Sequence, residues 1–315
     1  DVPKSLAERD CAQQCFDILL APDFGQRQSR FFLGQGAGAA EKVGNGTERL
    51  ITHYMAKSGE FHVYGARLYL TTGLLYAFDP RLPIQQLHEI SMPALVWVAR
   101  EMGEGADLEE SSPFRYMTSD VFRKMARRFW GDEICADFST CAGKAMAAAR
   151  IQDRQLAKEC LILCDFSYPF IHSPATPDHV GDPTLESRIC AAVTGMNMDE
   201  QGLYRVGERA FNLQRAILTR EGRKGREQDG LEEFNFNIPL KGEWGNPECL
   251  VPGRDGEPFS RRGMVVERDE FEKMKDEFYR IRGWDVATGF QTRAKLQELE
   301  LDDIAHTLER EGLTA

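Results

Sequence analysis

Apolar residues recur with a helical period in several separate segments, and this pattern limits the fold more than any other feature of the chain. In residues 121–130 they occupy positions i, i+1, i+4, i+5, i+8 and i+9, with basic residues between them and Gly131 after them. Such spacing gives one apolar stripe on a helix that a glycine ends. Residues 203–217, with Leu203, Val206, Ala210, Leu213 and Ile217 as the stripe, and residues 271–281 repeat the pattern before Gly222 and Gly283. The sequence therefore predicts a mainly α fold of irregular helical domains with little or no sheet.

Weaker signals add short elements and joints. Thr292 is placed to cap a short helix, and Asp302 or Asp303 to open the last one. The best strand candidate is residues 61–70 (FHVYGARLYL), which Gly65 weakens. Segments rich in glycine, proline and charge at residues 101–113, 172–183 and 220–263 are predicted to be surface loops.

Length and charge narrow the class of protein. At 315 residues, with 42% hydrophobic residues, and at about 150 residues per unit, one large or two modest domains are expected. The net charge of -11 repels phosphate backbones, so we expect no nucleic-acid partner. The chain has neither an apolar run of membrane-spanning length nor a basic, apolar leader. These features predict a cytoplasmic protein without a membrane partner.

The cysteines raise the question of a metal site. Eight are scattered along the chain without any C-x-x-C pair, so reduced thiols are expected and local sequence cannot supply a complete iron–sulfur or zinc site. Cys11 and Cys15 have the spacing of buried thiols on a helix. In residues 158–170 (KECLILCDFSYPF), Cys160 and Cys164 would share one stripe of a helix that Pro169 ends. Composition alone favours packing for these two, and iron ligation stays open.

Two other patterns have simpler interpretations. Residues 34–39 (GQGAGA) imitate a dinucleotide-binding fingerprint, but no alternating βαβ unit surrounds them, which favours a glycine-rich helix entry. The six histidines are dispersed without an H-x-x-x-H pair, which argues against a protease-like zinc site.

Several segments, in order, resemble the C-terminal half of the aldehyde ferredoxin oxidoreductase family, the tungsten-pterin enzymes of anaerobes. Residues 33–61 resemble its Gly-turn and Ala-Ala helix segment, and residues 73–89 (GLLYAFDPRLPIQQLHE) its Arg-to-His segment. Residues 159–166 (ECLILCDF) resemble its second Asp-x-x-Gly-Leu-Cys-x-Phe box. Residues 207–234 and 279–304 resemble its paired C-terminal signatures, with Arg-Gly-Trp-Asp and Thr-Gly.

The resemblance implies roles for five residues. Cys164 falls on the cysteine that supplies one ligand of a [4Fe-4S] cluster, and Glu159 and Leu163 fall on positions that hold the tungsten-bis(pterin). His88 falls on the active-site histidine, a proton donor beside the metal, since imidazole titrates near neutral pH. Arg81 matches an arginine expected to contact phosphate or pterin.

The resemblance also implies an activity and partners. The chain would be the C-terminal half of an oxidoreductase that converts a small aldehyde to a carboxylic acid and passes electrons through the cluster to a ferredoxin-like acceptor. Residues 1–85 would end the helical middle domain, and residues 86–315 would form the helical C-terminal domain. The N-terminal β pterin-binding domain has no counterpart here, so the cofactors would be shared with a missing half or partner subunit, and the isolated fragment is expected to be inactive.

Departures from the family pattern keep an alternative open. Glu159 stands where the box has Asp, Ile162 replaces its glycine, and Ile90 stands where a pterin-contacting lysine is expected. Residues 83–87 replace small residues before His88. The alternative is a cofactor-free helical subunit or interaction module derived from the same family.

Overall fold

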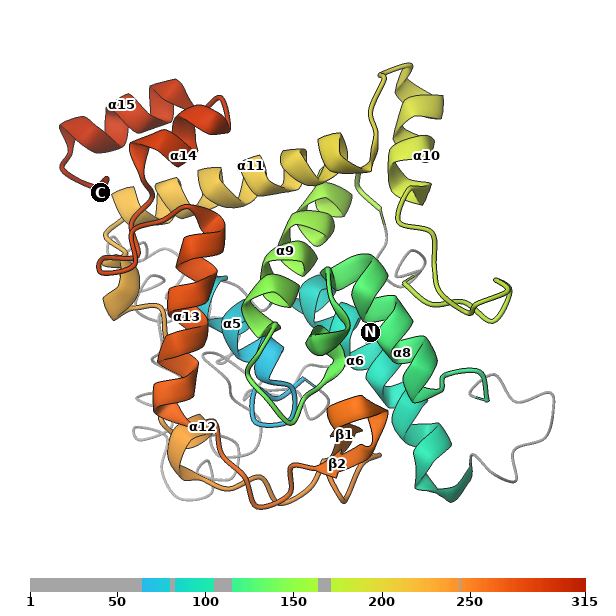
Figure 1. The fold of residues 1–315 in the computed structure, drawn as a ribbon. Coiled ribbons are helices and arrows are strands. Elements are labelled where there is room, and N and C mark those ends of the chain that lie inside the picture. Colours follow the sequence, from blue (N-terminus) through green and yellow to red (C-terminus); the bar gives the residue numbers. More distant parts are fainter. Residues whose placement is uncertain (1–63, 80–82, 105–114, 164–170, 244) are drawn as a thin grey trace, which may run out of the picture.

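The protein is built from helices packed around one long central helix, as Figure 1 shows. The computed structural model describes residues 64–79, 83–104, 115–163, 171–243 and 245–315. Within these ranges the strands form one two-stranded sheet. The predicted mainly α class is therefore confirmed.

The helices fall into three kinds. The α-helices are α5 (Leu70–Phe78), α6 (Ile84–Ala99), α8 (Ser119–Met125), α9 (Lys144–Cys160), α10 (Leu185–Thr194), α11 (Glu200–Arg220), α12 (Phe234–Asn237), α13 (Arg268–Arg282), α14 (Arg293–Glu298) and α15 (Asp302–Arg310). Two π-helical segments, η1 (Arg100–Glu104) and η2 (Ala126–Trp130), continue α6 and α8. The short 3₁₀ segments are η3 (Glu133–Ala136), η4 (Gly225–Glu227) and η5 (Arg254–Gly256).

Helix α9 lies at the centre because it packs against α5, α6, α11 and α13. Its buried face is rich in alanine, which lets neighbouring helices approach closely. The tightest crossing is with α11 at Gly207, where an added Cβ would lie 1.8 Å from the Asp153 carbonyl oxygen. A glycine is therefore required there for the two helices to cross at this distance.

Two of the predicted apolar stripes belong to the main core. All six apolar residues of residues 121–130 are buried, and Gly131 follows them with φ of 102°. Phe271, Met274 and Phe278 of α13 are also buried, each contributing about 1.5–3 kcal/mol by leaving water. Ile281, predicted for the same stripe, is 42% exposed. Thr292 caps α14 as predicted, since its hydroxyl accepts from the Lys295 N–H at 3.2 Å.

Helix α11 buries a different face from the one predicted. Leu203 is buried, but Leu213 and Ile217 are 38% and 49% exposed. The inward face instead combines apolar side chains with polar ones, among them Asn212 and Arg215. Their burial is possible because both find hydrogen-bond partners in the interior, which removes most of the cost of leaving water.

The predicted strand at residues 61–70 is wrong where the structure describes it. Residues 64–68 form a bend and a turn, and Leu70 already begins α5. The strands lie instead in the segment predicted to be loop: β1 (Leu250–Pro252) pairs antiparallel with β2 (Pro258–Ser260), with Val251 opposite Phe259. Three-residue strands are too short to show an alternating pattern, so periodicity could not find them.

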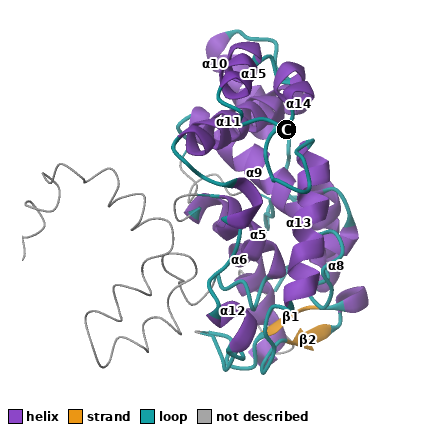
Figure 2. Ribbon diagram, turned by 90° about the vertical axis from the view of Figure 1, so that its left-hand side faces the viewer, coloured by secondary structure: helices purple, strands orange, loops and turns teal. Residues whose placement is uncertain are grey.

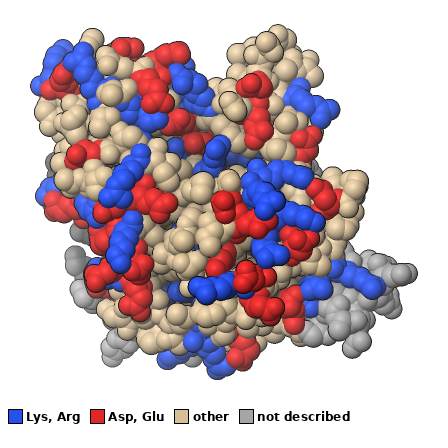
Figure 3. Space-filling model, in the orientation of Figure 1, with Lys and Arg blue, Asp and Glu red and all other residues tan. Residues whose placement is uncertain are grey.

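The surface charge and the lengths of the helices bear on the expected partners. On the face shown in Figure 3, acidic and basic side chains of the described residues are interspersed rather than gathered by sign. None of the helices in the described part of the chain is long and apolar enough to span a membrane. Seen from the side in Figure 2, α10, α11, α14 and α15 lie together at one end and the small sheet at the other.

Candidate functional site

Helix α9 ends in a turn that carries the predicted cofactor-binding residues. The N–H of Ile162 donates to the Glu159 carbonyl at 3.0 Å, and the N–H of Leu163 donates to the Lys158 carbonyl at 3.1 Å. This pair of bonds is a Schellman motif, which needs a left-handed residue just past the helix. Ile162 supplies it with φ of 58°.

This turn corrects the predicted course of the chain. The helix ends at Cys160 rather than continuing toward Pro169. Cys160 is exposed, so the interpretation of it as a packed core thiol is wrong. Partial burial of the sulfur, reinforced by the Glu159 carboxylate, raises the pKa of the Cys160 thiol. The thiol therefore stays protonated near pH 7.

Ile162 adopts a backbone conformation that glycine takes without strain. A β-branched side chain in the left-handed region is unusual, and the conformation costs roughly 1–2 kcal/mol compared with a right-handed one. Its side chain is 92% exposed, so little packing offsets that cost. The position therefore has the backbone that suits the glycine of the family box, with a different side chain on it.

His88 lies on the second turn of α6 and is buried, with 4% of its surface exposed. Its Nε2 lies 2.9 Å from the hydroxyl oxygen of Tyr64, and the two rings are 5.6 Å apart between centroids. A histidine and a tyrosine joined in this way can pass a proton between them. Tyr64 was not predicted as a site residue, because its role depends on a partner 24 positions away along the chain.

A buried ionic network joins α6 to α9 beside His88. The Arg154 guanidinium donates to Glu89 Oε2 at 2.8 Å and to Glu186 Oε1 at 2.5 Å. Gln155 also donates to Glu89 Oε2, and the Trp130 indole N–H donates to Oε1 at 3.3 Å. Because Glu89 follows His88 directly and Arg154 precedes Glu159 on α9, this network fixes the two helices that carry the predicted residues.

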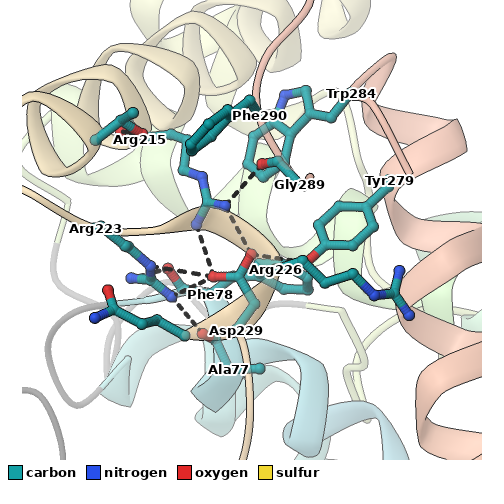
Figure 4. Close-up of polar contacts among 12 residues, drawn as sticks. Ala77, Phe78, Arg215, Arg223, Arg226, Asp229, Tyr279, Trp284, Gly289 and Phe290 are labelled. Carbon is teal, nitrogen blue, oxygen red and sulfur yellow. Dashed lines mark hydrogen bonds and ion pairs between the residues drawn. The ribbon is translucent and has the colours of Figure 1, made fainter. Parts of the chain in front are cut away.

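A second buried network, drawn in Figure 4, centres on Asp229, which is fully buried. Arg215 donates to both of its carboxylate oxygens at 2.7 Å, and Arg223 donates to Oδ1 at 2.7 Å. The Tyr279 hydroxyl donates to Oδ2 at 2.7 Å. Burial, with the Asp229 carboxylate adding to it, raises the pKa of Tyr279, which keeps its hydroxyl protonated as a donor. These residues come from the two C-terminal segments that carry the family resemblance.

The Asp229 network also reaches the end of α5. Arg223 Nη2 donates to the Ala77 carbonyl at 2.6 Å, and Nη1 donates to the Phe78 carbonyl at 3.3 Å. The next residue, Asp79, is fully buried and accepts from Gln86 Nε2 of α6 at 3.1 Å. The sequence placed Asp229 in a surface loop, and its burial depends on partners that are distant along the chain.

Tyr116 and His172 form a second tyrosine–histidine pair, which the sequence did not predict. The Tyr116 hydroxyl oxygen lies 2.6 Å from His172 Nδ1. Burial lowers the pKa of His172 to about 4, so the imidazole is neutral near pH 7 while its Nδ1 shares a hydrogen bond with the Tyr116 hydroxyl.

The structure brings part of the predicted set together. Helices α6 and α9 pack directly, so His88 lies on the helix next to the one whose last turn carries Glu159 and which Leu163 follows. Arg81, Cys164, the glycine-rich residues 34–39 and the Cys11–Cys15 pair lie outside the described residues. Within the described ranges, no three histidine, cysteine, aspartate or glutamate side chains gather as a metal site.

The fold and these segments define a chain of irregular helical domains, and sequence comparison gives its family. Residues 25–301 match the family described as aldehyde ferredoxin oxidoreductase, domains 2 and 3. The chain belongs to this family. A solved structure described as the active site complex BamBC of benzoyl coenzyme A reductase in complex with 1,5-dienoyl-CoA is similar at 17% identity and a TM-score of 0.49, over 88% of this chain. The chain spans 37% of the length of that chain.

Proposed function

We propose that this chain supplies the helical half of a tungsten-dependent enzyme of the aldehyde:ferredoxin oxidoreductase type. The reaction would convert a small aldehyde and water to a carboxylic acid, two protons and two electrons. The electrons would leave singly through a [4Fe-4S] cluster to a ferredoxin-like acceptor. The family match over residues 25–301 is the observation that supports this proposal most strongly.

The end of α9 fits a pterin and a cluster. When bound, the tungsten-bis(pterin) supplies the oxygen-transfer and two-electron chemistry that side chains do not perform. Glu159 and Leu163 would hold the pterin from either side of the left-handed turn, and Cys164 would give one thiolate to the cluster. The fit rests on the turn itself, because a φ of 58° at residue 162 is a conformation that a glycine in the family box could adopt without strain.

His88 would handle a proton of the reaction. Its imidazole is buried, and its Nε2 is hydrogen-bonded to Tyr64, so a proton leaving the substrate could pass through this pair. The buried Glu89–Arg154 network beside it would keep the ring in place. Arg81 would contact a pterin or phosphate oxygen by a charge-assisted hydrogen bond.

The remaining ligands and the electron acceptor would come from a partner. We propose that an N-terminal half, on the same polypeptide or another, carries the β pterin-binding domain and the other cluster ligands. In this chain, residues 1–85 would close the middle domain and residues 86–315 would form the C-terminal domain. The enzyme would work in the cytoplasm, and the chain alone would be inactive.

Metal analysis of Cys164→Ala in the natural complex tests the proposal, with Cys160→Ala as the matched control. The wild type should hold tungsten and about four irons per active site. Cys164→Ala should lose the irons, whereas Cys160→Ala should keep them because its thiol lies exposed beside the site. Equal iron contents in the two variants would refute the assignment of Cys164.

The second candidate, a cofactor-free helical subunit of the same family, is favoured by Ile90. This residue is fully buried in the main core, where the pattern would have a lysine facing the pterin. A natural complex that contains neither tungsten nor iron would support this candidate and contradict the first.

A further inference from the structure

Within the described residues, the Asp229 network reaches the end of α5 in two ways: the Tyr279 ring packs edge-on against Phe78, and the Arg223 guanidinium supplies the hydrogen bonds. The guanidinium donates to the carbonyls of Ala77 and Phe78 in the last turn of that helix. Those carbonyls carry the partial negative charge of a helix C-terminus, which favours a cation there. Arg215, the other arginine on Asp229, instead donates to the Gly289 carbonyl at 2.8 Å.

Asp229 holds Arg223 in this place. The carboxylate accepts from Arg223 Nε at 3.1 Å and from Nη2 at 2.7 Å, so two donors of the planar fork are fixed. Burial lowers the pKa of Arg223, and the Asp229 carboxylate opposes that change. The guanidinium therefore stays charged and aimed at the α5 carbonyls.

A short path of contacts leads from these carbonyls to His88. Phe78 is followed by Asp79, whose N–H donates to the Leu75 carbonyl at 3.2 Å and whose carboxylate accepts from Gln86. Gln86 stands two residues before His88 on α6, and both its side chain and that of Asp79 are buried. The end of α5 is thus joined to the first turn of α6 by a hydrogen bond shielded from water, where such bonds are strongest.

We propose that Arg223 is a positioning residue that sets the place of the His88 imidazole by holding the last turn of α5. Its relevance to proton transfer rests on the proposed function, but the coupling itself does not. Arg223→Lys keeps the charge and loses the fork, because an ammonium group cannot span Asp229 and two carbonyls together. Arg215→Lys is the matched control, since it weakens the hydrogen bonding to the same buried carboxylate at a residue that makes no hydrogen bond to α5.

The coupling is measured on the complete protein by NMR with ¹⁵N-labelled histidine and by amide hydrogen exchange. A His88→Gln sample identifies the His88 imidazole signals. Arg223→Lys should move these signals and raise the exchange rate of the Asp79 amide at least about tenfold. Arg215→Lys should leave both near their wild-type values although it also destabilises the fold.

Two outcomes would overturn the proposal: equal effects of the two lysine variants, or unchanged His88 signals in Arg223→Lys. If Arg223→Lys does not fold, Gln86→Met cuts the path at its last step, and it must then move the His88 signals without speeding exchange at Asp79. None of these measurements needs the cofactors. Absence of tungsten in the natural complex would refute the proposed enzyme and leave the coupling standing.

Discussion

Replacing Ile162 by glycine should stabilise the protein, which is unusual for the loss of a large apolar side chain. The side chain is 92% exposed, so its removal uncovers almost no buried apolar surface. Relief of the left-handed conformation gives back roughly 1–2 kcal/mol. The greater freedom of glycine in the unfolded chain removes about 0.4–1 kcal/mol of that gain. At mid-range the free energy of unfolding should therefore rise by about 0.8 kcal/mol, within limits of about 0 and 1.6 kcal/mol.

Val193→Gly is the matched control because Val193 is also β-branched and 80% exposed, yet it lies within α10. That change should lower the free energy of unfolding by about 0.4–1 kcal/mol through the same unfolded-state effect. The difference between the two variants isolates the cost of the left-handed backbone, about 1–2 kcal/mol. Urea unfolding followed by circular dichroism measures both values, with unchanged m-values as a check. If the two substitutions destabilise equally, residue 162 does not adopt this conformation and the fit of the turn to the family box fails.

Three further substitutions test the interior. Burial lowers the pKa of His172 to about 4, so as pH falls from about 6.5 to 4 the unfolded chain takes up a proton that the folded wild type does not, and the free energy of unfolding should fall by up to about 3 kcal/mol. His172→Gln should remove this pH dependence, which urea unfolding midpoints across that pH range will measure. Gly207→Ala should lower the free energy of unfolding by at least about 3 kcal/mol, because its Cβ would meet the Asp153 carbonyl oxygen. Gly202→Ala on the same helix should leave it nearly unchanged, and thermal unfolding measures both variants. Asp229→Asn should lose about 3–5 kcal/mol by leaving two buried guanidinium groups without their shared carboxylate, and a smaller loss in urea unfolding would contradict the central role of that group.

Where side chains pack by hydrophobicity alone, the sequence predicted the fold well. The stripes on α8 and α13 were found because period and burial coincide there. The α11 stripe was found as a helix but assigned the wrong inward face, because Asn212 and Arg215 are buried through partners far along the chain. The Trp284 indole N–H donates to the Asn212 side-chain oxygen at 2.9 Å across 72 positions. A pattern read within one helix cannot anticipate such a partner.

The candidate site was predicted by resemblance far more than by pattern. Nothing in the period of residues 158–170 required the helix to stop at Cys160, since an isoleucine is a poor signal for a left-handed turn. Tyr64 and Asp229 were missed for the same physical reason. Each has its role through a hydrogen bond to a residue outside its own segment.

The two buried networks make different contributions to the same site. Glu89 and Arg154 join α6 to α9, and Arg223 joins the end of α5 to the loop of Asp229. Buried ion pairs are weak sources of stability, since apolar residues of similar volume often serve as well or better. An apolar contact, however, would let one helix slide along the other, whereas charged groups with directed hydrogen bonds accept one register only. One network contacts the last turn of α5, and the other contacts α6 at Glu89. Together the two networks hold α5, α6 and α9 in one arrangement, and His88 lies on one of these helices.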